Sequence, residues 1–223
     1  MKILKTVTTQ SNNPIELIGS EKSGNNILII GVFHGDEPQG KFLIEEYLKK
    51  HSSSANAVQN NLLFIPCLNP DGLVQNTRTN ANGVDLNRNF PTKNWGINQG
   101  ENATCDDCTS SYYGGKSPAS EVETQFVIDI INKYNPKAIL TLHAPYKVVN
   151  YDGPAEELAQ KISQIIKYPT ESSIGYPTPG SFGTYCGVER NIPTITLELD
   201  EKIPTEQLIL PAFKIFDLLK NLF

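Results

Sequence analysis

Short apolar runs alternate with longer amphipathic stretches along the chain. Four runs are almost wholly apolar, at residues 26–33, 62–68, 138–143 and 194–199, and two weaker ones lie at 15–18 and 147–150. Continuous apolar runs of this length are typical of strands that a sheet buries on both faces. The pattern therefore predicts a sheet with four strong strands and two weaker ones.

Helical periodicity fills the intervals between these runs, at residues 38–50, 120–134, 155–167 and 205–222. Ser120 and Glu123 have the spacing of a capping box, which predicts that a helix begins after Ser120. Strands that alternate with helices favour a parallel sheet. We therefore expect an α/β fold: a single domain over residues 1–223, with a mostly parallel mixed sheet and helices on both faces.

Polar residues capable of chemistry stand where the four strong strands end. His34 follows the first strand, Asn69 the second, His143 ends the third, and Glu198 lies near the end of the fourth. Ligands of parallel sheets bind outside the carboxyl ends of the strands. The long segments 69–118 and 168–193 are rich in Gly, Pro, Asn and Ser, and loops of that length are usually functional.

His34 and Glu37 are three residues apart in a turn between a strand and a helix, so both side chains face one side. With His143 they offer two imidazoles and one carboxylate, a set that binds catalytic zinc and leaves a position for water. A histidine at a strand end is more often a hydrogen-bonded structural residue. The coincidence of both histidines at one expected sheet edge favours the metal site.

Two arginines, Arg78 and Arg88, lie in the Gly- and Asn-rich segment between these ligands. A guanidinium group binds a carboxylate through two parallel hydrogen bonds, so the arginines indicate an anionic ligand. Residues 69–72 and 82–83 have the composition of β-turns. Both interpretations hold together if the turns position the arginines.

Glu198 interrupts an otherwise apolar strand. A carboxylate is costly to bury without a partner. A structural salt bridge would explain the residue, and so would a general base beside a metal-bound water, whose pKa burial would tune. Position alone leaves both explanations open.

The composition excludes several classes of partner. Lys and Arg number 19 and Asp and Glu 24, for a net charge of −5, whereas a nucleic-acid surface needs clustered positive charge. No apolar run approaches the ~18 residues of a membrane span, and the first residues lack the features of a signal peptide. We expect no nucleic-acid or membrane partner and a cytoplasmic location.

The four cysteines include one spaced pair, Cys105 and Cys108. A structural zinc site of the ribbon type needs a second such pair, which the sequence lacks. We expect the pair to be a local loop feature, either reduced or disulfide-linked. Cys67 ends an apolar run and is expected to be a small core residue.

Five motifs taken together resemble the zinc metallocarboxypeptidase family. They are His34-Gly35-Asp36-Glu37, Asn69-Pro70-Asp71-Gly72, the run 83–90, Leu142-His143 and the run 196–199, and they span about residues 27–200. The resemblance implies a carboxypeptidase-like fold with one zinc ion per chain. The implied roles are zinc ligation by His34, Glu37 and His143, general base by Glu198, polarisation of the scissile carbonyl by Arg78, binding of the substrate's terminal carboxylate by Asn87 and Arg88, and substrate binding by Tyr176.

Finer details of the sequence are similar to the bacterial members that act on murein peptides. The resemblance implies hydrolysis of the amide bond between γ-D-glutamate and meso-diaminopimelate during peptidoglycan recycling. The implied partner is a small peptide with a free C-terminal carboxylate. The polar side chain of diaminopimelate calls for a polar pocket, which residues 181–185 could line.

Two other functions compete with this one. Zinc deacylases of the succinylglutamate desuccinylase or aspartoacylase type share the ligands, but they usually lack the full run 83–91. A zinc-containing peptide-binding module without catalysis would be expected to have Glu198 or a ligand replaced, and none is.

Overall fold

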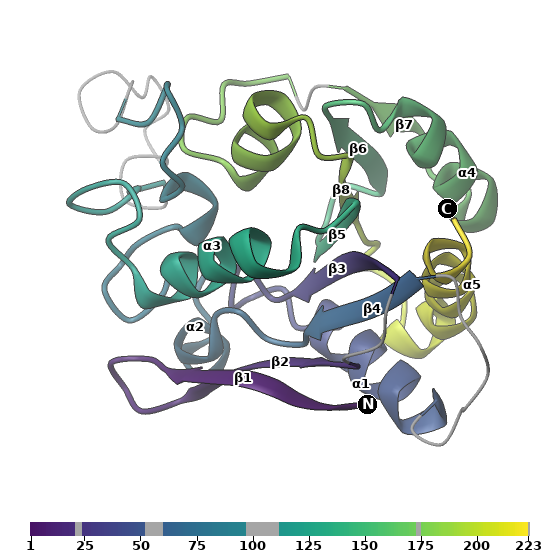
Figure 1. Ribbon diagram of the computed structural model, residues 1–223, viewed down its shortest axis with the longest axis horizontal. Helices are drawn as coiled ribbons and strands as arrows, with labels where there is room; N and C mark the ends of the chain where they lie inside the picture. The colour runs from purple at the N-terminus through teal and green to yellow at the C-terminus, as the bar shows by residue number, and fades with distance from the viewer. Residues whose placement is uncertain (21–23, 52–59, 97–111, 173–174, 223) are drawn as a thin grey trace.

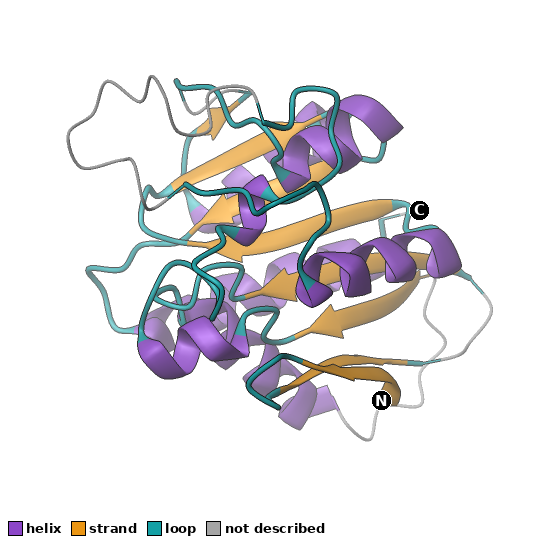
Figure 2. Cartoon of the chain, turned by 90° about the vertical axis from the view of Figure 1, so that its left-hand side faces the viewer, coloured by secondary structure: helices purple, strands orange, loops and turns teal. Residues whose placement is uncertain are grey.

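One eight-stranded sheet organises the chain in the computed structural model, which describes residues 1–20, 24–51, 60–96, 112–172 and 175–222. The strands lie in the order β1-β2-β4-β3-β5-β8-β6-β7, side by side in one twisted sheet (Figure 2). Their bounds are β1 Lys2–Thr8, β2 Pro14–Gly19, β3 Asn25–Gly31, β4 Asn60–Ile65, β5 Ala138–His143, β6 Val148–Asp152, β7 Thr170–Glu171 and β8 Thr194–Glu198.

The centre of the sheet is parallel and its margins are mixed. β4, β3, β5 and β8 run parallel to one another, whereas β1 pairs with β2, β2 with β4, and β6 with β8 in antiparallel fashion. The four parallel strands are the four strong apolar runs, as predicted. The expected single α/β domain with a mostly parallel mixed sheet is therefore confirmed.

Helices cover both faces of the sheet (Figure 1). They are α1 Gln39–His51, α2 Pro70–Gln75, α3 Val122–Tyr134, α4 Glu156–Ile166 and α5 Ile209–Lys220, with 3₁₀ turns η1 Leu86–Arg88 and η3 Thr205–Leu208 and a π-helical turn η2 Thr184–Val188. Among the described residues, none of these helices is both long and apolar enough to cross a bilayer.

The core consists of two layers because successive strand residues point to opposite faces. Ile27 and Ile29 of β3 pack in one cluster with α1, α4 and α5. Leu28 and Ile30 pack in the other with α3, η1 and η2. The apolar run Ile27–Ile30 of β3 follows from this two-sided burial.

The hydrophobic pattern of the sequence did not predict two of the strands, β1 and β7. β1 forms the edge of the sheet as a hairpin with β2, and most of its residues are exposed or half-buried, so it carries little apolar signal. β7 has two residues and pairs only with β6. The weaker runs at 15–18 and 147–150 are strands β2 and β6, as predicted.

Two local predictions are wrong. Residues 69–72 are not an isolated turn, because Asn69 is the N-cap of α2 and its Oδ1 accepts a hydrogen bond of 2.9 Å from the Gly72 amide. Ser120 is not the N-cap of α3, which begins after Glu121. The Ser120 hydroxyl instead donates to the Glu121 carboxylate and accepts from the Asn89 amide, because a long-range partner competes with the local cap.

Candidate active site

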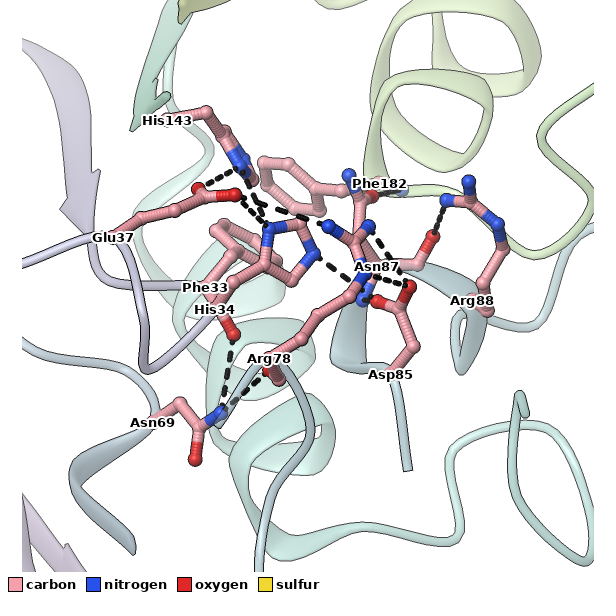
Figure 3. Close-up of polar contacts among 10 residues, drawn as sticks. All are labelled: Phe33, His34, Glu37, Asn69, Arg78, Asp85, Asn87, Arg88, His143 and Phe182. Atoms are coloured by element: carbon pink, nitrogen blue, oxygen red, sulfur yellow. Dashed lines mark hydrogen bonds and ion pairs between the residues drawn. The ribbon is translucent and has the colours of Figure 1, made fainter. Parts of the chain in front are cut away.

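The predicted site residues converge at the carboxyl edge of the parallel strands. β3 and β5 are neighbours, with Gly31 paired to Leu142, and β5 and β8 are neighbours, with His143 paired to Glu198. The turn after β3 that carries His34 therefore lies beside the end of β5. Figure 3 shows the side chains that meet there.

Three donor side chains form one buried cluster. The Nδ1 atom of His34 lies 2.7 Å from Oε1 of Glu37, and the Nδ1 atom of His143 lies 3.0 Å from Oε2 of Glu37. The two Nδ1 atoms are 3.3 Å apart. A search of the described residues for clustered metal-binding side chains identifies these three, His34, Glu37 and His143, as a group that could hold a metal ion.

The spacing of these donors fits zinc. Zinc bound tetrahedrally at about 2.0–2.1 Å from each ligand places its donor atoms about 3.3 Å apart. The two Nδ1 atoms, 3.3 Å apart, match this separation, and each lies within 3.0 Å of one oxygen of Glu37. One donor atom from each of the three residues lies within 4.8 Å of the others. Two nitrogens and one carboxylate are also the donor set of catalytic zinc sites.

The turn that carries two of the ligands is held by a close approach of α2. A Cβ atom on Gly35 would lie 1.9 Å from the backbone of Gly72, so only glycine fits. The Nδ2 atom of Asn69 donates to the carbonyl oxygen of Phe33 at 3.4 Å. Val32 has a φ of 54°, which is rare for a β-branched residue. Such strained positions cluster at functional sites.

Asp85 contacts His34 on the side of the ring that faces away from Glu37. The sequence did not reveal this supporting role. The Oδ1 atom of Asp85 lies 3.2 Å from Nε2 of His34, and its side chain is fully buried. A carboxylate on the second nitrogen of a metal-binding histidine fixes the ring and its tautomer. The position of this acid between the two arginines is the signal that could have indicated it.

The charges of the cluster are mutually dependent. Burial alone lowers the pKa of His34, but the carboxylates of Glu37 and Asp85 outweigh it and raise this pKa to about 9. Burial raises the pKa of Glu37, but His34 and His143 outweigh it and hold this pKa well below its usual range. Because a histidine binds a metal ion only through a deprotonated nitrogen, a bound cation would oppose this rise in the pKa of His34.

His143 is oriented by packing rather than by a second carboxylate. Its ring stacks on Phe33, with centroids 5.3 Å apart and planes at 26°. Phe33 in turn packs against Phe182, whose ring centroid is also 5.3 Å away. An apolar wall of this kind limits the rotation of the imidazole ring.

Arg78 lies next to the metal ligands and is anchored by Asp85. Its Nε and Nη2 atoms are each 3.0 Å from Oδ2 of Asp85, and its Nη1 atom is 3.8 Å from Oε1 of Glu37. The Tyr112 ring lies 5.1 Å from the guanidinium carbon of Arg78 and 5.3 Å from that of Arg88. Tyr112 thus contacts both arginines, which the sequence did not indicate.

Asn87 and Arg88 are held by η1 and by the segment before η2. Asn87 accepts a hydrogen bond of 2.8 Å from the Phe182 amide, and its backbone carbonyl accepts one of 2.7 Å from Nη1 of Arg88. A Cβ atom on Gly180 would lie 2.1 Å from the Arg88 carbonyl oxygen, so the two segments pack without a gap. The predicted pair of anion-binding side chains therefore lies on a rigid support.

Glu198 ends β8 beside His143 and is 8% exposed. Its Oε2 atom is buried and has no hydrogen-bond partner among the described residues. Burial raises the pKa of Glu198, and the neighbouring Glu37 adds to the effect. The structural salt bridge that the sequence left open is therefore absent from the described residues.

A polar cavity of about 350 Å³ joins all eight predicted site residues. Tyr176, which is 42% exposed, lines it together with the metal ligands, the arginines, Asn87 and Glu198. Ser181 and Gly183 of the segment expected to form a pocket also line it, whereas Phe182 and Tyr185 are buried in the core.

The two cysteines that the structure describes do not line this cavity. Cys67 and Cys186 are buried free thiols, and the burial of Cys67 agrees with the prediction. Cys105 and Cys108 lie outside the described residues.

Comparison with known proteins agrees with the geometry. The model of a family described as zinc carboxypeptidase matches residues 3–215. Murein peptide amidase A from Escherichia coli is 35% identical over 184 residues, which cover 80% of this chain and 72% of the relative. The crystal structure of a murein-tripeptide amidase from Escherichia coli superimposes with a TM-score of 0.80 at 28% identity, covering 99% of this chain and 93% of the other.

A more distant structure shares the fold. Carboxypeptidase A from Helicoverpa armigera superimposes with a TM-score of 0.71 at 16% identity, covering 96% of this chain and 66% of the other. This fold, a sheet with helices on both faces, is thus shared by proteins whose sequences are only 16% identical.

Proposed function

Because this chain belongs to the zinc carboxypeptidase family, we propose that it hydrolyses the amide bond before a C-terminal residue with a free carboxylate. The finer proposal is the bond between γ-D-glutamate and meso-diaminopimelate in a murein peptide. One observation supports both: a buried His34–Glu37–His143 cluster opens into a polar cavity that also holds Glu198 and Arg88. The cytoplasmic location stays a prediction.

The cluster would hold a zinc ion through His34, Glu37 and His143. When bound, zinc supplies a Lewis acid for a carbonyl oxygen and for a water molecule. Glu198 accepts the proton of that water as it attacks the carbonyl carbon, and then donates the proton to the leaving amine. The burial of Glu198 suits both steps, because it raises the pKa of the carboxyl group toward neutral pH. A group whose pKa lies near the working pH can both accept and donate a proton.

Arg78 stabilises the negative charge that develops on the carbonyl oxygen. A fixed donor in such a position is typically worth about 3–4 kcal/mol of transition-state stabilisation. Asp85 holds the guanidinium in place before substrate binds, since it contacts both Nε and Nη2. The same carboxylate orients His34, so one buried acid positions both a metal ligand and an oxyanion donor.

Arg88 and Asn87 bind the free carboxylate of the residue to be released. The Arg88 side chain lies at the cavity, and the amide nitrogen of the Asn87 side chain makes no hydrogen bond to the described residues. A guanidinium and an amide offer parallel donors to a carboxylate. The free α-carboxylate of a chain end meets this requirement, so we expect the enzyme to act on terminal residues.

Arg88→Gln is expected to raise KM for a peptide with a free carboxylate by about 100-fold, with a smaller effect on kcat, because a charge-assisted contact is lost. The measurement is steady-state kinetics on a tripeptide and on its C-terminal amide. The wild type should cleave the amide far less well, and the variant should treat the two peptides nearly alike. An equal loss on both peptides would contradict the proposed carboxylate contact.

The substrate itself is tested with L-alanyl-γ-D-glutamyl-meso-diaminopimelate. We expect release of diaminopimelate, loss of the reaction in a chelator, and recovery on addition of zinc. N-succinyl-L-glutamate, the substrate type of the deacylases, should stay intact. Hydrolysis of the succinyl compound without release of diaminopimelate would favour the deacylase function, and tight binding of the tripeptide without turnover would favour a binding module.

A further inference from the structure

Two arginine side chains lie over the ring of one tyrosine, Tyr112. The ring centroid is 5.1 Å from the guanidinium carbon of Arg78 and 5.3 Å from that of Arg88. Both distances are within the roughly 6 Å over which an aromatic face attracts a cation. Both arginines line the catalytic cavity, whereas Tyr112 is not among the residues that line it. An effect of Tyr112 on a bound substrate would therefore pass through the arginines.

Two hydrogen bonds fix the backbone that carries Tyr112. The carbonyl oxygen of Tyr113 accepts a hydrogen bond of 2.8 Å from the Asp85 amide, and the carbonyl of the following residue accepts one of 2.7 Å from Nδ2 of Asn89. Asp85 and Asn89 are the residues on either side of η1, the turn that carries Arg88. The segment that follows Tyr112 is thus tied to both ends of this turn, which keeps the ring beside the arginine.

The two arginines differ in their other partners. Arg78 has a carboxylate partner, because its Nε and Nη2 atoms are each 3.0 Å from Oδ2 of Asp85. Arg88 is only 4% exposed and makes no ion pair with the described residues. Its side chain donates one hydrogen bond there, from Nη1 to the Asn87 carbonyl oxygen at 2.7 Å. A buried charge without a partner is costly, so the Tyr112 ring matters more for Arg88 than for Arg78.

An aromatic ring stabilises a guanidinium group without occupying its hydrogen-bond donors. The ring contacts the face of the planar group, whereas the N–H donors point outward in its plane. A carboxylate beside Arg88 would instead take up these donors and would repel an incoming anion. A neutral ring therefore suits an arginine that has to bind the carboxylate of a substrate.

We propose that Tyr112 is a positioning residue that holds Arg88 in place, free of an acidic partner, for the carboxylate of the substrate. The proposal rests on the proposed function, since that function assigns the carboxylate to Arg88. Arg78 depends less on the ring, because Asp85 already holds its guanidinium group. Tyr112 should therefore affect the binding of a free carboxylate and hardly affect the chemical step.

The test is Tyr112→Leu, which removes the aromatic face and keeps an apolar side chain. On L-alanyl-γ-D-glutamyl-meso-diaminopimelate we expect kcat/KM to fall by about tenfold, mainly through KM, as for the loss of a desolvated cation–π contact. On the C-terminal α-carboxamide of the same peptide the loss should be less than about threefold. An equal loss on both peptides, or a loss confined to kcat, would overturn the proposal.

Two further variants separate the ring from its surroundings. Tyr112→Phe keeps the aromatic face and should stay within about threefold of the wild type on both peptides. Tyr113→Leu changes the neighbouring tyrosine, which is 39% exposed, and leaves the backbone hydrogen bond in place, so it should have no effect. A loss in Tyr112→Phe as large as that in Tyr112→Leu would overturn the role of the ring face. Tyr112→Met offers the same comparison where Tyr112→Leu does not fold.

A double-mutant cycle tests whether Tyr112 acts through Arg88. Arg88→Gln alone is expected to raise KM by about 100-fold. The double variant Arg88→Gln/Tyr112→Leu should have nearly the same KM, because the ring then has no guanidinium group to hold. A further tenfold rise in the double variant would show that the two residues act independently and would overturn the proposal.

Binding of free meso-diaminopimelate gives a readout that needs no turnover. Calorimetric titration of the zinc-loaded protein should show a Kd about tenfold higher in Tyr112→Leu than in the wild type, and an unchanged Kd in Tyr112→Phe. Equal binding by Tyr112→Leu and the wild type would overturn the proposal, and so would the absence of binding to the wild type. Weaker binding in Tyr112→Leu without cleavage of any peptide would support the role of Tyr112 and contradict the proposed reaction.

Discussion

Glu198→Gln is expected to lower kcat/KM by about three orders of magnitude while the fold and the zinc content stay unchanged, because general acid–base catalysis typically contributes 10²–10⁴-fold. Glutamine has the same shape but cannot accept and return a proton. Glu198 is not among the three donors of the metal cluster, so its replacement leaves the ligands in place. The measurement pairs steady-state kinetics with zinc analysis of the purified variant.

The control for this experiment is Glu201→Gln, since Glu201 lines the same cavity and is exposed. It should keep nearly normal turnover. Near-normal turnover in Glu198→Gln itself would remove Glu198 from the proton-transfer role. A variant that has lost its zinc would show instead that Glu198 supports the metal site.

His143→Ala is expected to abolish zinc binding and to reduce activity to the level of the uncatalysed reaction. Two ligands are left, one of them a carboxylate, and the removal of one protein ligand from a three-ligand site opens it to water. In the wild type, zinc at 100 times its Kd should raise the free energy of unfolding by about 2.7 kcal/mol. Thermal unfolding with and without zinc measures this effect, which the variant should lack.

His51→Ala provides the matched histidine control. His51 is the last residue of α1, its ring stacks on Tyr47, and it does not line the cavity. This variant should bind zinc as the wild type does, with at most a small loss of stability. Zinc-dependent activity in His143→Ala at the wild-type level would show that the metal binds elsewhere.

The residues that the sequence predicted share one property: each lies at or near the end of a strand, or in a motif of distinctive composition. His34, His143 and Glu198 follow runs whose apolar content predicts buried parallel strands, and the edge where such strands end is a general consequence of the fold. The convergence of these three residues can therefore be predicted from the apolar runs, which locate the strands, and from the parallel direction of the strands, which brings their ends to one edge. The resemblance added the roles of Arg78, Asn87 and Arg88.

Residues whose roles depend on long-range partners could not be predicted in this way. Asp85 contacts His34, which is 51 positions away, and its position between two arginines is a local signal that does not identify this partner. The same holds for Ser120, whose local capping pattern is overridden by Asn89.

The separation of the two histidines along the chain affects the stage of folding at which the complete zinc site can form. His34 and His143 are 109 residues apart and meet only because β3 and β5 pair. An unfolded chain would have to close a loop of that length before the third donor could act, which loop-closure entropy opposes. We therefore expect zinc to bind after the sheet has assembled, and the chain to reach its native topology without the ion.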